Sequence, residues 1–349
     1  MKKNLILVLS LVFVAASCNW LTGASGAMGV LRSEDSGGNF SPRNSIDNKT
    51  NLNSVSVNDL VFEPGNSQNL YLASAAGAFK STDAGQSWKI LLTNILVADL
   101  SIDAQDTSTI YVVGSSDNHG KIVKTTDGGG SWKDIYTEPT TGDSVMSIAV
   151  DPTNHMHLLA GLKAGEIIQS LDAGTTWQVA ADLHDQVSRV RYGVNKRPYV
   201  LAYNYGLYES KDGSSNFTNL TGTLTNGLVN FNSNFSAVSN FLDLAFDVKQ
   251  TGVLYLATDV GLLRTINDGA EWSYMSMPVR NSVLRTSAIG VNPKDSNNLY
   301  AVVGSTLFKS INGGVTWETK PLPSGQEVRQ ILIDASSPNV IYLGLGVRK

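Results

Sequence analysis

The feature that most constrains the fold is an eight-residue motif that returns along the chain. It reads S-T-D-A-G-Q-S-W at 81–88, with close copies at 125–132, 170–177, 265–272 and 310–317. The tryptophans that end these copies are 44, 45, 95 and 45 residues apart. A fixed period of roughly 40 to 50 residues is typical of repeat architectures. The sequence therefore predicts a series of similar units rather than one irregular domain.

Two weaker copies extend the series. The long gap contains S-K-D-G-S-S-N-F at 210–217, in which Phe217 replaces the tryptophan, and G-V-L-R-S-E-D-S-G-G-N-F at 29–40 aligns with G-L-L-R-T-I-N-D-G-A-E-W at 261–272. At the other end, Q-I-L-I-D and V-I-Y-L-G-L-G begin a repeat that has no motif of its own. We expect the two ends to build one repeat together.

Short apolar segments precede each motif, such as D-L-V-F-E-P followed by N-L-Y-L-A. Four short strands per repeat with tight turns are typical of a propeller blade. The predicted fold class is all-β: a seven-bladed β-propeller with four-stranded blades over 29–349. A composite blade made from both termini closes the ring and leaves no long unpaired edge strand.

The chemistry of the motif is that of a tight turn. Its glycine supplies a positive φ, its Asp or Asn accepts backbone N–H groups, its Ser or Thr adds a hydroxyl, and its Trp covers the turn. The residues assigned to this structural role are Asp35, Asp83, Asp127, Asp172, Asp212, Asn267, Asn312, Trp88, Trp132, Trp177, Trp272 and Trp317. The alternative is a carboxylate array for a metal or for acid–base chemistry. Copies spread around a ring cannot converge on one substrate, which favours the structural role. We also predict no metal site and no cofactor.

Composition and the N-terminus indicate where the protein acts. The chain has 349 residues, 42% of them hydrophobic, and a formal net charge of -4, which favours a globular protein and gives no reason to expect a nucleic-acid partner. Lys2 and Lys3 precede an apolar run that leads into Cys18, the only cysteine. This pattern predicts a lipoprotein signal peptide at 1–17, lipidation of Cys18 and a linker at 18–28. A plain signal peptide with an incidental cysteine is the alternative, because Ala15 stands where the lipidation motif usually has Leu.

The repeated S-x-D-x-G-x-x-W resembles the Asp-box, or BNR, repeat of sialidases, xyloglucan-cleaving glycosidases, sortilin-type receptors and photosystem II assembly factors. The resemblance covers nearly all of residues 29–349. A single ring behind an export signal is most similar to the photosystem II stability and assembly factor-like group, which implies an assembly or binding role. Two departures separate the chain from the enzymes: the Arg-Ile-Pro signature of sialidases is absent, and the xyloglucan-cleaving type resembles two propellers rather than one.

Alignment of the first strands predicts a site in the central channel. One equivalent position holds Asp59, Asp99, Ser147, Arg189, Asp243, Ala288 and Gln330. Two positions further along, most residues are small, but the fourth blade has Arg191. One hypothesis is a polar pocket at the channel mouth, on the face opposite the motif turns, in which Arg189 and Arg191 hold an anion and Asp59, Asp99 and Asp243 contact hydroxyls or amines. The alternative is a plugged channel in which the arginines only neutralise the carboxylates.

Two other features are open at this stage. The insertion at 218–240 is rich in Asn, Ser and Thr and leads to Phe241, and it is either a binding loop or an unstructured surface loop. His155 and His157 are expected to be solvent-exposed turn residues rather than metal ligands.

Together these observations favour an exported, lipid-anchored and non-catalytic propeller that acts as a protein-binding scaffold or assembly factor for an envelope complex. Its expected partners are the membrane, through the lipid, and another envelope protein or a glycan. The alternative is a glycoside hydrolase, or a sialidase-like protein that processes or binds glycans, with a carboxylate pair drawn from Asp59, Asp99 and Asp243.

Overall fold

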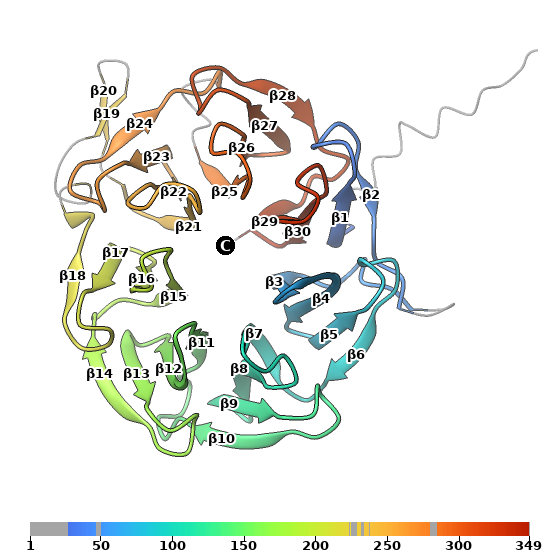
Figure 1. Cartoon of the computed structure of the whole chain (residues 1–349), viewed down its shortest axis with the longest axis vertical. Coiled ribbons are helices and arrows are strands. Elements are labelled where there is room, and N and C mark those ends of the chain that lie inside the picture. Colours follow the sequence, from blue (N-terminus) through green and yellow to red (C-terminus); the bar gives the residue numbers. More distant parts are fainter. Residues whose placement is uncertain are drawn as a thin grey trace, which may run out of the picture.

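A computed structural model describes residues 27–46, 50–222, 224, 229–231, 234–236, 238–279 and 285–348. These residues form seven four-stranded antiparallel sheets arranged as blades around a central axis (Figure 1). The predicted seven-bladed β-propeller is therefore confirmed. The predicted signal peptide and Cys18 lie outside the described residues. Within the described part, no helix is both long enough and apolar enough to cross a membrane.

Each blade runs outward from the axis through four strands. The innermost strands are β3 (Val57–Glu63), β7 (Leu96–Ile102), β11 (Val145–Asp151), β15 (Val187–Tyr192), β21 (Phe241–Phe246), β25 (Thr286–Val291) and β29 (Glu327–Ile333). The second strands are β4 (Asn66–Ser74), β8 (Ile110–Ser116), β12 (Asn154–Leu162), β16 (Pro198–Ala202), β22 (Leu254–Thr258), β26 (Leu299–Val303) and β30 (Ile341–Gly346). The third strands are β5 (Gly77–Ser81), β9 (His119–Thr125), β13 (Glu166–Ser170), β17 (Gly206–Ser210), β23 (Gly261–Thr265), β27 (Thr306–Ser310) and β1 (Gly29–Ser33). The outer strands are β6 (Lys89–Leu92), β10 (Lys133–Thr137), β14 (Gln178–Asp182), β18 (Phe217–Asn219), β24 (Ser273–Met275), β28 (Glu318–Pro321) and β2 (Ser41–Pro42).

The two ends of the chain share one blade, as expected. Its strand order is β2-β1-β30-β29, and β1 pairs with β30 from Gly29 opposite Leu345 to Ser33 opposite Ile341. The N-terminal segment therefore supplies the outer half of this blade and the C-terminal segment the inner half. Backbone hydrogen bonds close the ring, so the composite blade needs no covalent link between the ends.

The core lies between neighbouring blades. Tyr71 and Ala73 of β4, for example, form one apolar cluster with Val97 and Leu100 of β7 and Val112 of β8 in the next blade. A second strand contacts a neighbouring blade on both of its faces, which explains why all five residues of β16, β22 and β26 are buried. These strands read as continuous apolar runs because neither face meets water.

The repeated motif forms the turn between the third and fourth strands, and its internal contacts are those predicted. Ser81 Oγ accepts the N–H of Gly85 at 2.8 Å, and Asp83 Oδ1 accepts the Ser81 hydroxyl at 2.8 Å and the Ser87 N–H at 2.9 Å. Asn267 Oδ1 accepts the equivalent groups at 2.9 and 3.0 Å. Because an amide makes the same contacts as a carboxylate, the negative charge is not required for the turn.

The motif also joins blades, which the sequence did not indicate. The Trp88 indole N–H donates to the Arg43 carbonyl at 2.7 Å, and Trp272 and Trp317 make the matching bonds to Leu220 and Ser276 at 2.9 and 3.0 Å. Each acceptor belongs to the preceding blade or the segment that follows it. The turn is therefore not self-contained, because its tryptophan is bonded to its neighbour as well as packed on it.

The insertion after β18 contains a short hairpin, β19 (Val229–Phe231) and β20 (Asn234–Ser236), beside β24. Phe241 is not part of an exposed loop: it begins the inner strand β21 and is fully buried. Residues 223, 225–228, 232–233 and 237 of the insertion lie outside the described residues.

Candidate functional site: a closed ion-pair cluster beneath a channel pocket

The predicted channel residues do come together. Asp59, Asp99 and Asp243 lie on β3, β7 and β21, and Arg189 and Arg191 reach them from β15. Alternation along a strand places residues 189 and 191 on the same side of β15, which is why both arginines enter the channel.

Ion pairs connect all five side chains. The pairs are Arg189 Nη1 to Asp59 Oδ1 at 3.1 Å, Arg189 Nε to Asp243 Oδ1 at 3.6 Å, Arg191 Nη2 to Asp59 Oδ1 at 3.2 Å, and Arg191 Nη1 to Asp99 Oδ2 at 2.9 Å. The carboxylate side chains of Asp59, Asp99 and Asp243 are only 1%, 4% and 7% exposed. The three aspartates thus form a closed cluster with the arginines instead of an open ring at the channel mouth.

A second set of contacts explains why polar side chains occupy this position in several blades. The inner strands of neighbouring blades do not belong to one sheet, so their facing N–H groups need other acceptors. Side chains at the equivalent position supply them: Gln330 Oε1 accepts from Leu60 at 2.7 Å, Asp99 Oδ2 from Ile148 at 3.2 Å, Ser147 Oγ from Val190 at 2.9 Å, and Asp243 Oδ2 from Ile289 at 3.1 Å. This bonding role was missed from the sequence, although the recurrence of Asp, Ser and Gln at one aligned position was its signal.

Asp59 is the exception in this pattern. The N–H of Leu100, on the next inner strand, donates instead to Asp99 Oδ1 at 2.9 Å. Asp59 Oδ2 is consequently buried without a hydrogen-bond partner among the described residues. A buried carboxylate oxygen without a donor is costly, whereas a protonated carboxyl group can itself donate.

Electrostatics favour that protonated form. Burial and the negative charge of Asp99 raise the pKa of Asp59 to about 7, against the opposing pull of Arg191 and Arg189. Burial also disfavours the ionised form of Asp99, but the Arg191 guanidinium and the surrounding hydrogen bonds outweigh it and hold the pKa of Asp99 well below its usual range. Burial raises the pKa of Asp243, in part offset by Arg189. With Asp59 neutral, two carboxylates balance two guanidinium groups.

The chain covers part of the channel at the end where the inner strands begin. Arg329 of β29 donates from Nε and Nη2 to the Val347 carbonyl at 3.1 and 2.8 Å, and from Nη1 to Asn58 Oδ1 at 2.8 Å. The segment that follows β30 is therefore held against the starts of β29 and β3. The sequence had placed the candidate site at this end.

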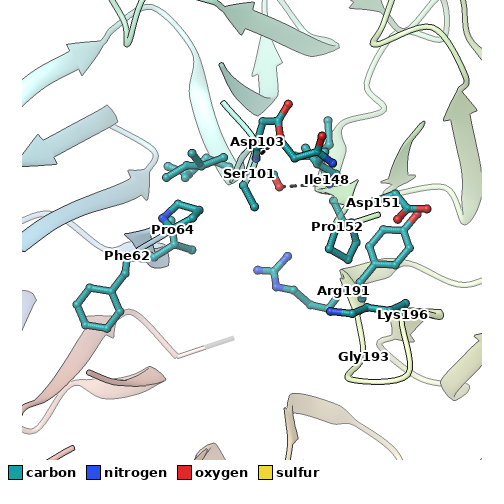
Figure 2. Close-up of a pocket in the computed structure, with 18 residues that line it drawn as sticks. Phe62, Pro64, Ser101, Asp103, Ile148, Asp151, Pro152, Arg191, Gly193 and Lys196 are labelled. Atoms are coloured by element: carbon teal, nitrogen blue, oxygen red, sulfur yellow. Dashed lines mark hydrogen bonds between the residues drawn. The ribbon is translucent and has the colours of Figure 1, made fainter. Parts of the chain in front are cut away.

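A pocket of about 350 Å³ opens at the other end of the channel (Figure 2). It is lined by the ends of β3, β7, β11 and β15 and by the turns that follow them. The motif turns lie on this same face, because their backbone bonds to the start of the second strand, as in Ala84 N–H to Gln68 O at 2.8 Å and Ala173 N–H to Met156 O at 2.8 Å. The pocket is thus on the face where the sequence analysis did not place a site.

Most of the pocket wall is apolar, with contributions from Pro64 and Pro152, whereas the Phe62 ring points away from the pocket (Figure 2) and packs against Tyr342. Arg191 reaches from β15 toward the middle of the pocket, and Lys196 lies at its edge (Figure 2). The Arg191 side chain is 27% exposed, more than any other member of the ion-pair cluster. Arg191 therefore joins the closed cluster to the pocket.

One histidine prediction is wrong. His157 is not a solvent-exposed turn residue: it lies within β12, its exposed fraction is 8%, and its Nδ1 is 3.3 Å from Asp151 Oδ2 and 3.5 Å from the Tyr192 hydroxyl. The turn between β11 and β12 is only two residues long, so His157 lies in the strand that follows it. His155 remains half exposed, with Nδ1 3.5 Å from Asp103 Oδ2. No group of three or more potential metal ligands occurs among the described residues.

The fold and the channel define a single-ring, seven-bladed β-propeller, and comparison with known proteins finds a xyloglucanase and several propeller structures similar to it. No protein-family model matches the chain. Among curated proteins, it is similar to a xyloglucanase of Hypocrea jecorina (strain QM6a), with 23% identity over 325 aligned residues that cover 83% of this chain and 35% of the relative. The chain thus spans about a third of the length of that relative.

Solved structures share the propeller fold. The GH74 xyloglucanase from Xanthomonas campestris has a TM-score of 0.66 and 16% identity, covering 84% of this chain and 51% of the enzyme. The structure of YCF48 bound to a D1 peptide has a TM-score of 0.62 and 16% identity, covering 84% of this chain and 93% of YCF48. At these identities the likeness concerns the fold alone.

Proposed function

We propose that this protein is a non-catalytic propeller that binds another protein outside the cytoplasm and acts as a scaffold or assembly factor for an envelope complex. The observation that carries this proposal is the closed state of the channel carboxylates. Asp59, Asp99 and Asp243 are each paired with a guanidinium group, and Asp99 and Asp243 also accept backbone N–H groups. A glycosidase needs one carboxyl group that reaches the leaving oxygen and a second that reaches the sugar or a water. Carboxylates with these partners and this burial are poorly placed for either role.

The fraction of each similar structure that the match covers also supports a non-catalytic role. The match covers 93% of YCF48 but about half of the GH74 xyloglucanase. The predicted export signal at 1–17 and the predicted lipidation of Cys18 supply the extracytoplasmic location and the membrane anchor in this proposal. The binding surface we propose is the face that carries the pocket, because Arg191 and Lys196 are presented there beside apolar groups.

An affinity pull-down of the full-length protein from its own membranes tests this function. Lys196→Glu reverses an exposed charge at the pocket edge, and Lys163→Glu is the matched control, because Lys163 is also exposed but lies in a turn on the opposite face. A protein retained by the wild type and by Lys163→Glu, and lost from Lys196→Glu, is the expected result. If no protein is retained by any form, the scaffold proposal is wrong.

The second candidate is a glycan-processing enzyme, favoured by the similarity to a curated xyloglucanase. Its test is the release of reducing ends from xyloglucan and from envelope glycans by the purified protein. Release that is abolished by Asp59→Asn or Asp99→Asn, in variants that remain folded, would establish catalysis and replace the scaffold proposal.

A further inference from the structure

The acidic and the basic side chains of the channel pocket differ in how many hydrogen-bond partners they already have. Its acidic residues are already engaged: Asp103 accepts the Gln105 N–H at 2.8 Å, and Asp151 accepts the N–H and hydroxyl of Thr153 at 2.8 and 2.7 Å. Asp103 also lies near His155, and Asp151 near His157. These carboxylates are thus bonded within their own turns and lie beside histidines.

The cationic groups of the pocket are less fully engaged. Arg191 uses Nη1 and Nη2 for Asp99, Asp59 and Ser147, but none of the described residues accepts a hydrogen bond from its Nε. Lys196 is exposed, and the described residues include no acceptor for its Nζ. Two positively charged donors thus face a pocket whose other walls are mainly apolar.

The net charge of the ion-pair cluster beneath the pocket decides whether an anion can approach these donors. With Asp59 protonated, the five-residue cluster is neutral, so an incoming carboxylate does not meet a net negative charge beneath the pocket. Binding near Arg191 would place a further negative charge close to Asp59 and Asp99, while Arg189 and Asp243 lie on the far side of Asp59.

We propose that this pocket binds the carboxylate of a small ligand with an apolar body, such as an aryl or branched-chain carboxylic acid, with the carboxylate at Arg191 Nε and Lys196 Nζ and the body against Pro64 and Pro152. A volume of about 350 Å³ suits a ligand of this size. The inference refines the proposed function, on which it rests for the location of the binding surface. Both a free acid and the C-terminal residue of a chain carry such a carboxylate, and the test separates these sources.

The test uses the full folded protein and calorimetric titration with 3-phenylpropionate. Its neutral counterpart, 3-phenylpropionamide, has nearly the same shape and should bind about tenfold more weakly, the equivalent of losing one charge-assisted contact. The peptide Gly-Gly-Gly-Phe with a free or an amidated C-terminus forms the second arm. Tight binding of the free-carboxylate peptide alone would assign the pocket to a chain terminus, and binding of 3-phenylpropionate to a free acid.

Two matched variants locate the binding. Ala104→Trp fills the pocket entrance from an exposed turn position, and Ala335→Trp makes the same change at the equivalent exposed position of the composite blade, outside the pocket. We expect Ala104→Trp to abolish binding and Ala335→Trp to leave it unchanged, with both variants melting as the wild type does. Lys196→Gln should weaken the acid but not the amide.

The dependence on pH provides an independent readout. A bound carboxylate competes for the Arg191 guanidinium and favours the protonated form of Asp59, so affinity for the acid should fall as the pH rises through neutrality, while affinity for the amide should not. Equal affinity for acid and amide, or unchanged binding by Ala104→Trp, overturns the proposal. A protein partner still retained in the pull-down would then leave the scaffold function standing.

Discussion

Asp59 and Asp99 occupy equivalent positions in the sequence, but the structure predicts that the same substitution will lower stability much more at Asp99 than at Asp59. Asp59→Asn replaces a carboxyl group that is largely protonated at mildly acidic pH by a neutral group of the same shape. Asp99→Asn instead removes an ionised partner of Arg191 and leaves one acceptor oxygen where two accept the N–H groups of Leu100 and Ile148. Breaking a buried ion pair from one side costs about 3 to 5 kcal/mol. We therefore expect Asp99→Asn to be strongly destabilised and Asp59→Asn to lose less than about 1 kcal/mol at pH 5.5.

The pH profile of Asp59→Asn gives the sharper test. The pKa of Asp59 is raised from the ordinary aspartate value of 3.8 to about 7 in the folded protein. Between these values the native state holds a proton that the unfolded chain has released, so this group makes the wild type less stable as the pH rises through the window. One proton corresponds to about 1.4 kcal/mol per pH unit, so the loss between pH 5.5 and pH 7 is at most roughly 2 kcal/mol. Asp59→Asn removes this slope.

The measurement is the free energy of unfolding from urea titrations at pH 5.5, 7 and 8.5, followed by tryptophan fluorescence. The stability of Asp59→Asn relative to the wild type should improve with pH, and the two curves should cross between pH 5.5 and pH 7. If Asp59→Asn is as unstable as Asp99→Asn, and its curve runs parallel to the wild type, then Asp59 is an ordinary ionised partner and our reasoning is wrong.

Three further predictions concern the blades, each checked by thermal or urea unfolding. Ser81→Ala removes the buried acceptor of a turn N–H and should cost about 1 to 3 kcal/mol, whereas an unchanged stability would show that water replaces the hydroxyl. Trp88→Phe loses an indole hydrogen bond to the Arg43 carbonyl and should lower the free energy of unfolding more than Trp132→Phe does, because the Trp132 indole N–H has no partner among the described residues. Equal losses in the two variants would show that only the packing of the ring contributes. Gly77→Ala should be far more damaging than Gly65→Ala, because both have positive φ but only at Gly77 would the added Cβ lie 2.2 Å from a backbone oxygen; similar effects would contradict this.

Much of the candidate site could be anticipated from aligned positions alone. The alignment placed Asp59, Asp99, Ser147, Arg189 and Asp243 in one ring, and they do meet in the channel. What it could not give was their partners. Whether a channel carboxylate faces solvent, a guanidinium group or a backbone N–H depends on how the inner strands of different blades are shifted relative to one another. An alignment of single repeats does not contain that shift.

The pocket was missed for a related reason. Its lining comes from four consecutive blades, and each contributes only a few residues with no distinctive pattern, such as Pro64 and Pro152. The buried position of His157 was likewise decided by the length of the β11–β12 hairpin, which brings it beside Tyr192 of the next blade.

The sequence by itself determined the number of blades, their four-strand pattern, the motif turns and the closure of the ring by both termini. These properties are local: each repeat carries its own turn chemistry and its own apolar strands, so the pattern can be read one repeat at a time. Only the tertiary structure decided which channel groups are paired, which one retains a proton and which end of the channel is open. Those properties depend on distances of a few ångströms between residues more than a hundred positions apart, such as Asp59 and Arg189, and on the exclusion of water that only the assembled ring produces.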